Sequence, residues 1–201
     1  IGTAVVTEFG ADSEIGWGRW TGGVTAGTPG TVGIHPFDVS NGTSSVHYVV
    51  GKPSIRNSGT VNYTLLGSTT PTLISGEGSV AANSLNSASM TMNFDTSTGS
   101  FNINVSALVN GANRTYDVSG LPLSITQNMM MNTARFTGTG NATNGFECGG
   151  SGACVTDVLG FFSGQNASRA GVSYRINTDR ASAQGPNCLL YTSPSPRDRY
   201  I

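Results

Sequence analysis

The sequence predicts an all-β fold, namely an antiparallel up-and-down barrel of about eight strands. Apolar and polar residues alternate over many short segments, which is the pattern of strands that bury one face. Glycine is abundant, with 28 residues, as in chains of short strands joined by tight turns. Helical periodicity is almost absent, and its best candidate, Gly164–Gly171, is too short for an independent helix. A two-sheet sandwich is the alternative that alternation alone does not exclude.

Most of the expected strands follow one another as hairpins. In the first, Gly16–Val24, Trp17 and Arg19 share one face, whereas Gly18 and Trp20 share the other. The later ones are Ser45–Gly51, Gly59–Gly67, Ser87–Phe94, a strand after the turn in Asp95–Leu108, Arg114–Gly120, Ala134–Gly140, Val155–Gly164 and Ala170–Ile176. A closed barrel suits this number of strands because closure removes exposed edges.

Two stretches interrupt the strand pattern and are expected to be long loops. Thr25–Ser44 is rich in Gly, Thr and Pro, and Leu121–Asn132 contains three consecutive methionines. Because methionine fills irregular gaps, the second loop is expected to plug one end of the barrel. The alternative is an adaptable apolar ligand surface.

The expected domain organisation is a single barrel with irregular ends. Residues 1–15 are interpreted as a linker or the remnant of an upstream domain, 16–180 as the barrel, and 181–187 as its exit. No apolar run approaches the ~18 residues that a membrane-spanning helix requires. The chain begins with Ile1 and is interpreted as a piece of a longer protein.

Composition and motifs favour a non-catalytic protein. The net charge is −1, which provides no electrostatic basis for nucleic-acid binding. His35 lies in an expected loop and His47 in an expected strand, and no cysteine or carboxylate stands at metal-ligand spacing from either. Both histidines are therefore expected to be ordinary surface or rim residues. The sequence predicts no metal, no cofactor and no enzymatic activity.

Cys148 and Cys154 enclose five small residues, and we predict a disulfide that pinches a hairpin tip. The loop-entropy account assigns such a small ring about 2 kcal/mol of stability. This disulfide implies an oxidising compartment, such as the periplasm or the cell surface. A reduced, inert pair is the alternative.

The segment "VLGFFSGQNASRAGVSYRI" resembles the closing hairpin of the barrel domain in transferrin-binding protein B-like proteins. The matching positions are Gly160, Phe162, Gly164, Ala167, Gly171 and Tyr174. The resemblance implies a structural role for them, with the glycines at a tight corner and the two aromatic rings in the core. It also implies a lipoprotein-like domain in the periplasm or on the outer-membrane surface of a Gram-negative bacterium. The pieces "GWGRW" and "HYVVGKP" resemble a variant in which such a barrel follows a FecR-type domain.

The last residues differ in character from the rest of the chain. Cys188–Asp198 is similar, residue for residue, to the translation of a transposase-type sequencing adapter. We therefore predict that residues 188–201 are an artefact, disordered and packed on nothing, and that natural sequence ends at Pro186 or Asn187. A genuine Pro-rich tail is the alternative.

The predicted function is binding of an unknown protein or small ligand at the cell envelope, linked to iron acquisition. Transferrin itself is not the expected partner, because one barrel is present where the transferrin receptor has two lobes. The ligand-binding residues are unknown, although the two long loops are the expected surface. The alternatives are a small integral outer-membrane barrel and a structural domain without a ligand.

Overall fold

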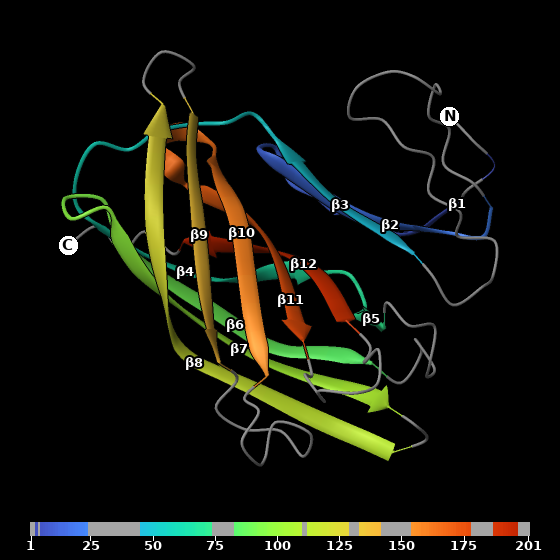
Figure 1. Ribbon diagram of the computed structural model, residues 1–201. Coiled ribbons are helices and arrows are strands. Elements are labelled where there is room, and N and C mark those ends of the chain that lie inside the picture. Colours follow the sequence, from blue (N-terminus) through green and yellow to red (C-terminus); the bar gives the residue numbers. More distant parts are fainter. Residues whose placement is uncertain are drawn as a thin grey trace, which may run out of the picture.

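The computed structural model describes residues 3, 5–23, 45–73, 83–109, 112–128, 133–141, 154–177 and 187–196, the last ten as backbone. Its elements are strands and one short 3₁₀ turn (Figure 1). They are β1 (Val5–Ala11), β2 (Ile15–Thr21), β3 (Val46–Gly51), β4 (Thr60–Ser68), β5 (Thr72–Leu73), β6 (Ser84–Asn93), β7 (Thr98–Val109), β8 (Ala112–Asn128), β9 (Thr133–Asn141), β10 (Val155–Ser163), η2 (Gln165–Ala167), β11 (Arg169–Asn177) and β12 (Asn187–Pro196).

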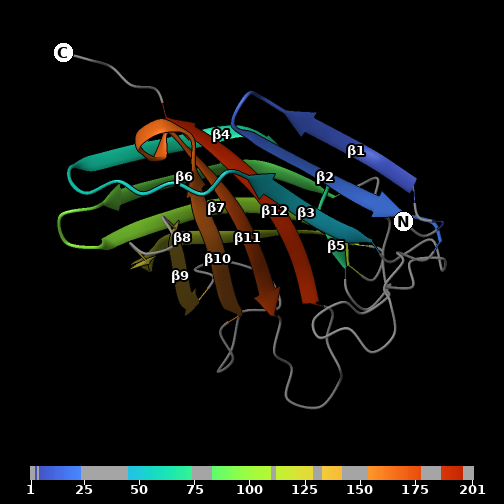
Figure 2. The same cartoon turned by 90° about the horizontal axis from the view of Figure 1, so that it is seen from above.

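The strands form two bodies, a barrel and a small sheet. In the barrel, β4 and β6 to β11 pair antiparallel in order of sequence, which gives seven strands in an up-and-down meander. Strand β12 pairs with β11 on one side and with β4 on the other, so it closes the ring. The predicted all-β barrel is thus confirmed. In the second body, β1, β2 and β3 form a separate three-stranded sheet beside the barrel (Figures 1 and 2).

Aromatic and aliphatic side chains from every described wall of the barrel fill its interior. Phe162 is completely buried at the centre, with the ring centroids of Phe94 and Phe136 each 5.0 Å away and that of Tyr63 at 6.0 Å. The largest fully buried side chains are Tyr63, Tyr174, Phe101, Phe136, Phe162, Met90, Met92, Val105 and Val118. The described part of the barrel is therefore a packed core and not a ligand-holding lumen.

The first third of the chain departs from the expected domain boundaries. Residues 5–11, interpreted as part of a linker or the remnant of an upstream domain, form strand β1. Strands β2 and β3, predicted to belong to the barrel, form a sheet with β1 instead, in which β2 pairs with both β1 and β3. The physical reason is that one face of this sheet is buried through Trp17 and His47 without joining the barrel ladder.

The predicted loop Leu121–Asn132 is also corrected, because β8 runs through to Asn128. Leu121, Leu123 and Ile125 point into the core. Gly120, where the expected strand ended, instead lies in a bulge with Ser119 opposite Asn102, where the register of β8 against β7 shifts. The three methionines at 129–131 and the loop Thr25–Ser44 lie outside the described residues.

The expectation that residues 188–201 are disordered and pack on nothing is likewise corrected for 188–196, while 197–201 lie outside the described residues. The backbone of Asn187–Pro196 occupies the seam between β11 and β4 as strand β12. A seven-stranded meander leaves two unpaired edges there, and main-chain hydrogen bonding satisfies them whatever the side chains are. The adapter origin of these residues stays a prediction.

Candidate functional site

The candidate site is the junction at which the small sheet packs against the barrel. Trp17 on β2 lies at its centre, between two glycines. A Cβ atom on Gly10 of β1 would lie 2.4 Å from the indole ring, and one on Gly67 of β4 would lie 2.1 Å from it. The ring therefore fits only because both neighbours lack a side chain, and it fixes the distance between the two bodies.

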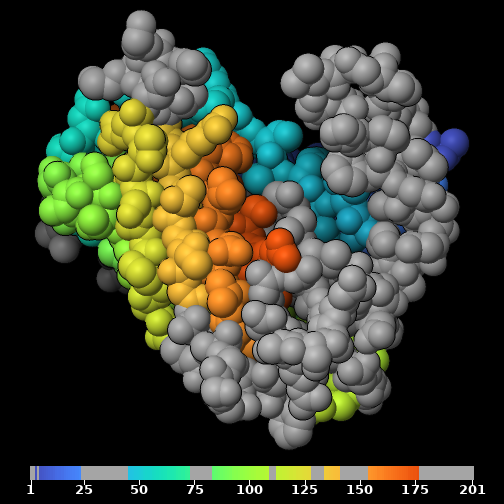
Figure 3. Space-filling view, in the orientation of Figure 1, coloured from blue at the N-terminus to red at the C-terminus, as the bar shows by residue number. Residues whose placement is uncertain are grey.

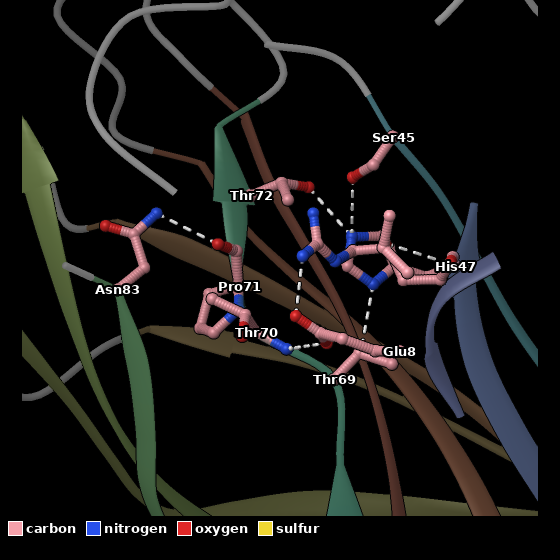
Figure 4. Close-up of polar contacts among 10 residues, drawn as sticks. Glu8, Ser45, His47, Thr69, Thr70, Pro71, Thr72 and Asn83 are labelled. Carbon is pink, nitrogen blue, oxygen red and sulfur yellow. Dashed lines mark hydrogen bonds and ion pairs between the residues drawn. The ribbon is translucent and has the colours of Figure 1, made fainter. Parts of the chain in front are cut away.

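A buried polar cluster flanks Trp17 at one end of the junction (Figure 4). The imidazole of His47 is held by hydroxyl groups, with Nδ1 2.7 Å from Oγ1 of Thr69. Its Nε2 lies 2.8 Å from Oγ1 of Thr72 and 3.1 Å from Oγ of Ser45. Because hydroxyls both donate and accept, either neutral tautomer of the imidazole is satisfied here. The cluster joins strand β3 to the chain between β4 and β5.

The prediction that His47 is a surface residue is wrong, since only 3 % of it is exposed. Burial, followed by the nearby positive charge of Arg19, lowers the pKa of His47 from 6.5 to about 4, although Glu8 acts in the opposite direction. The imidazole is therefore neutral at pH 7. Thr69 and Thr72 are buried as well, so the imidazole is sealed between the two bodies. This position suits a structural role and not that of an accessible general base.

Glu8 and Arg19 extend the cluster across the small sheet. Nη2 of Arg19 donates to Oε1 of Glu8 at 2.5 Å, and the backbone N–H of Thr70 donates to Oε2 at 2.6 Å. Burial alone would raise the pKa of Glu8, but the hydrogen bonds from Arg19 and Thr70 outweigh it and lower that pKa. The ion pair thus links β1 and β2 to the barrel chain after β4.

At the other end of the junction, the small sheet is hydrogen-bonded to the hairpin of β10 and β11. The hydroxyl of Ser163 lies 2.9 Å from the carbonyl oxygen of Glu14 and 2.8 Å from that of Lys52. Nε of Arg169 donates to Oδ2 of Asp12 at 2.5 Å. These bonds fasten one end of the small sheet, formed by the turn between β1 and β2 and the end of β3, to one barrel corner.

The predicted structural positions lie in this same hairpin. Phe162 and Tyr174 are buried in the core, and the hydroxyl of Tyr63 donates to the carbonyl oxygen of Ala167 at 2.7 Å. Gly164 has a φ of 73°, so it provides the left-handed turn into η2. Gly160 and Gly171 complete the set: their Cβ positions would strike Phe136 and Phe161, respectively.

Two predicted features lie partly or wholly outside the described residues. Cys154 is completely buried, but Cys148 is not described, so their pairing stays a prediction. His35 is also outside the described part of the chain. Within the described residues, no group of His, Cys, Asp and Glu is arranged to hold a metal ion, and no helix is long and apolar enough to cross a membrane.

The junction residues Glu8, Arg19, His47 and Thr69 were missed as site residues. One signal was available, because alternation places Trp17 and Arg19 on one face of β2, and the register then sets Arg19 opposite His47. A charged and an ionisable side chain beside a tryptophan indicate a face that is covered. The covering partner, the chain after β4, is not visible in a local pattern.

The opposite face of the small sheet is exposed and apolar. Phe9 is 71 % exposed, and Val6 and Val50 on the same face are exposed as well. The rings of Trp20 and Tyr48 stack on this face with centroids 4.9 Å apart. Six large hydrophobic residues of the described chain are exposed: these three, Val5 on the other face of the small sheet, and Leu66 and Leu159. Such clustering marks interaction surfaces.

A groove of about 380 Å³ runs where β3 faces the outer barrel wall of β9, β10 and β11. Figure 3 shows this hollow between the small sheet and the orange strands. Its lining includes Val50 and Pro53 on one side and Leu159 and Phe161 on the other, with Arg135 at its margin. A second hollow of similar volume continues along the wall and shares Leu159 with the first.

No protein-family model matches the sequence, and no curated protein matches it. Solved structures of transferrin-binding protein B are similar in fold. A double mutant from Haemophilus parasuis has a TM-score of 0.46 at 11 % identity, over 93 % of this chain and 33 % of that one. The intact Ap-TbpB, with its N and C lobes, has a TM-score of 0.45 at 11 % identity, over 97 % and 38 %. This chain spans about a third of their length, and these values assign no family.

Proposed function

We propose that this chain is a non-catalytic binding domain of a bacterial envelope protein, and that its partner is a protein. The small sheet and the groove at its edge form the binding surface, with the barrel as a rigid support. The observation that carries this proposal is the gathering of Val6, Phe9 and Val50 on one exposed face, beside the stacked rings of Trp20 and Tyr48. Exposing this much apolar area is unfavourable in water, and a protein partner would relieve that cost.

The composition of the barrel supports an external site. Aromatic rings fill the described interior, so a ligand inside would have to displace the core. The outer wall of β6 to β8 carries hydrogen-bonded polar side chains: Asn86 donates to Asn104 at 2.5 Å and to Ser106 at 2.8 Å, and Asn104 donates to Asp117. A wall of this kind faces water. It is the reverse of the apolar band that an integral outer-membrane barrel presents.

The envelope location and a link to iron acquisition complete the proposal. They rest on the hairpin positions from Gly160 to Tyr174 that resemble transferrin-binding protein B-like barrels, and on the predicted pairing of Cys148 with Cys154. A disulfide would persist in the periplasm or on the cell surface. A lipoprotein-like anchor upstream is part of the same proposal.

The test measures saturable binding by the immobilised protein of transferrin and of purified outer-membrane proteins from a Gram-negative bacterium. We expect one of them to bind with a defined Kd that weakens at least tenfold in the Phe9→Ser/Val50→Ser variant. The matched control is Leu66→Ser, which removes an exposed apolar side chain from the barrel. Equal loss in both variants, or no saturable binding, would leave a structural domain without a ligand.

A further inference from the structure

The edge of strand β3 faces the groove directly. Val49, Val50 and Gly51 follow one another in sequence, and all three line the same hollow. Side chains of consecutive strand residues point to opposite faces, so three in a row line one hollow only if the strand presents its edge to it. Within the described residues, β3 pairs with β2 alone, and the bridge from Pro53 to Ser163 lies beyond its end.

An edge of this kind carries main-chain donors and acceptors. In an antiparallel pair, alternate residues direct their N–H and C=O groups away from the partner strand. Over the last four residues of β3, Tyr48–Gly51, this creates a row about 13 Å long. No backbone hydrogen bond from Tyr48–Gly51 to another described segment accompanies the ladder with β2. The groove therefore offers main-chain hydrogen bonds along one side.

The opposite side of the groove offers apolar and positively charged contacts. Leu159 is 57 % exposed, and Phe161 pairs in register with Arg135 on β9 and with Gly171 on β11. Arg135 is exposed and forms no ion pair with another described residue. A Cβ on Gly171 would lie 2.7 Å from Phe161 and 2.8 Å from Val49, so this glycine lets the groove floor come close to β3.

From these observations we infer that the groove is a strand-acceptor site: an extended peptide segment of the partner adds to the edge of β3. Its alternate side chains pack on Leu159 and Phe161, and an acidic side chain pairs with Arg135. Main-chain bonds to β3 provide affinity, and the wall provides selectivity for apolar and acidic residues. A compact small molecule would leave most of the β3 row unused. This inference rests on the proposed function and specifies the class of partner.

The test selects displayed random ten-residue peptides against the whole protein and measures the affinity of enriched peptides. We expect apolar residues at alternate positions and at least one Asp or Glu. Affinity should fall at least tenfold in the Leu159→Asp/Arg135→Glu variant and stay unchanged in Leu66→Asp. Circular dichroism and thermal unfolding confirm that each variant folds.

Scanning N-methylation of an enriched peptide tests the strand geometry. Methylation removes one N–H donor, so it should abolish binding at every second position and be tolerated in between. Failure to enrich peptides, methylation effects without a period of two, or full affinity for the groove variant would overturn the inference. If the peptides instead lose affinity only in Val6→Ser/Phe9→Ser, which leaves the groove lining intact, the outer face is the site, and the proposed function stands while this inference fails.

Discussion

The barrel interior and the junction between barrel and small sheet are both buried, but different chemistry stabilises them. Around Phe162 the contacts are aromatic and aliphatic, and none of them changes charge with pH. At the junction, His47 and the ion pairs of Glu8 and Asp12 surround a single apolar contact through Trp17. The comparison indicates that acid or salt loosens the small sheet before it affects the barrel.

The largest expected effect tests the apolar side of this comparison. Phe162→Ala removes the ring that contacts Phe94, Phe136 and Tyr63, and it should lower the free energy of unfolding by about 4 kcal/mol. Urea unfolding followed by circular dichroism measures this loss. The matched control is Leu159→Ala on the same strand, whose side chain points outward and should contribute less than about 1 kcal/mol. Similar losses in both variants would show that the interior is not the source of stability.

The second effect comes from the histidine at the junction. The pKa of His47 is about 4 in the folded protein and 6.5 in the unfolded chain, so the unfolded chain binds the proton more tightly. The stability that this residue contributes is therefore complete above pH 6.5 and decreases as the pH falls from 6.5 to 4. The limiting loss is about 3 kcal/mol. Urea unfolding at a series of pH values measures it.

His47→Gln is the control for that pH dependence. A glutamine retains a donor and an acceptor for Thr69 and Thr72, but it does not titrate. The variant should show a smaller decrease in stability between pH 6.5 and 4.5, a range above the lowered pKa of Glu8. If the wild type and the variant lose stability in parallel, protonation of His47 does not control the junction.

Alternation was sufficient to predict the barrel strands, because each buries one face in a single core. Val61 and Tyr63 on β4, or Phe101 and Ile103 on β7, occupy the inward positions that the pattern predicts. The same rule does not reveal which core a strand joins, so β2 was assigned to the barrel. It also failed where Ser119 and Gly120 form a bulge, since glycine occurs both at bulges and at strand ends.

The junction was less predictable than the hairpin. The corner positions Gly164 and Ala167 follow one another closely in sequence, and both have a positive φ. The partners of His47, by contrast, are Thr69 and Thr72, which are more than twenty residues away and follow a strand of the other body. Local patterns predict a covered face on β3, and only the docking of two bodies determines which hydroxyl groups cover it.

The third prediction tests the apolar contact at the junction. Gly67→Ala would place a methyl group 2.1 Å from the indole of Trp17, so the ring must move, and about 2 kcal/mol of stability should be lost. Gly16→Ala is the control, because its Cβ would meet Ala11 and Val50 at 3.6 and 3.7 Å, which are ordinary contacts. Tryptophan emission should shift to the red in the first variant and not in the second, while the circular dichroism of the barrel is retained. A retained emission spectrum in both would show that Trp17 does not hold the two bodies together.

The smallest expected effect tests whether the charge of Asp12, or only its hydrogen bonding, holds the small sheet to the hairpin of β10 and β11. Asp12→Asn keeps the oxygen that accepts from the N–H groups of Glu14 and Ile15, but it removes the charge that faces Arg169. Burial alone would raise the pKa of Asp12, yet the hydrogen bonds from Arg169, Glu14 and Ile15 and the charge of Arg169 together outweigh it and lower that pKa. This contribution is therefore present at pH 7 and lost as the pH falls below the usual value of 3.8. Because the pair is partly exposed, the loss should be about 1 kcal/mol or less, and it should shrink in 1 M salt. The control is Asp95→Asn: its side chain accepts from the backbone N–H of Gly59 and forms no ion pair with another described residue, so the change should affect stability less and without this dependence on salt. An equal, salt-independent loss in both variants would mean that shape, and not charge, fastens the small sheet to the barrel corner.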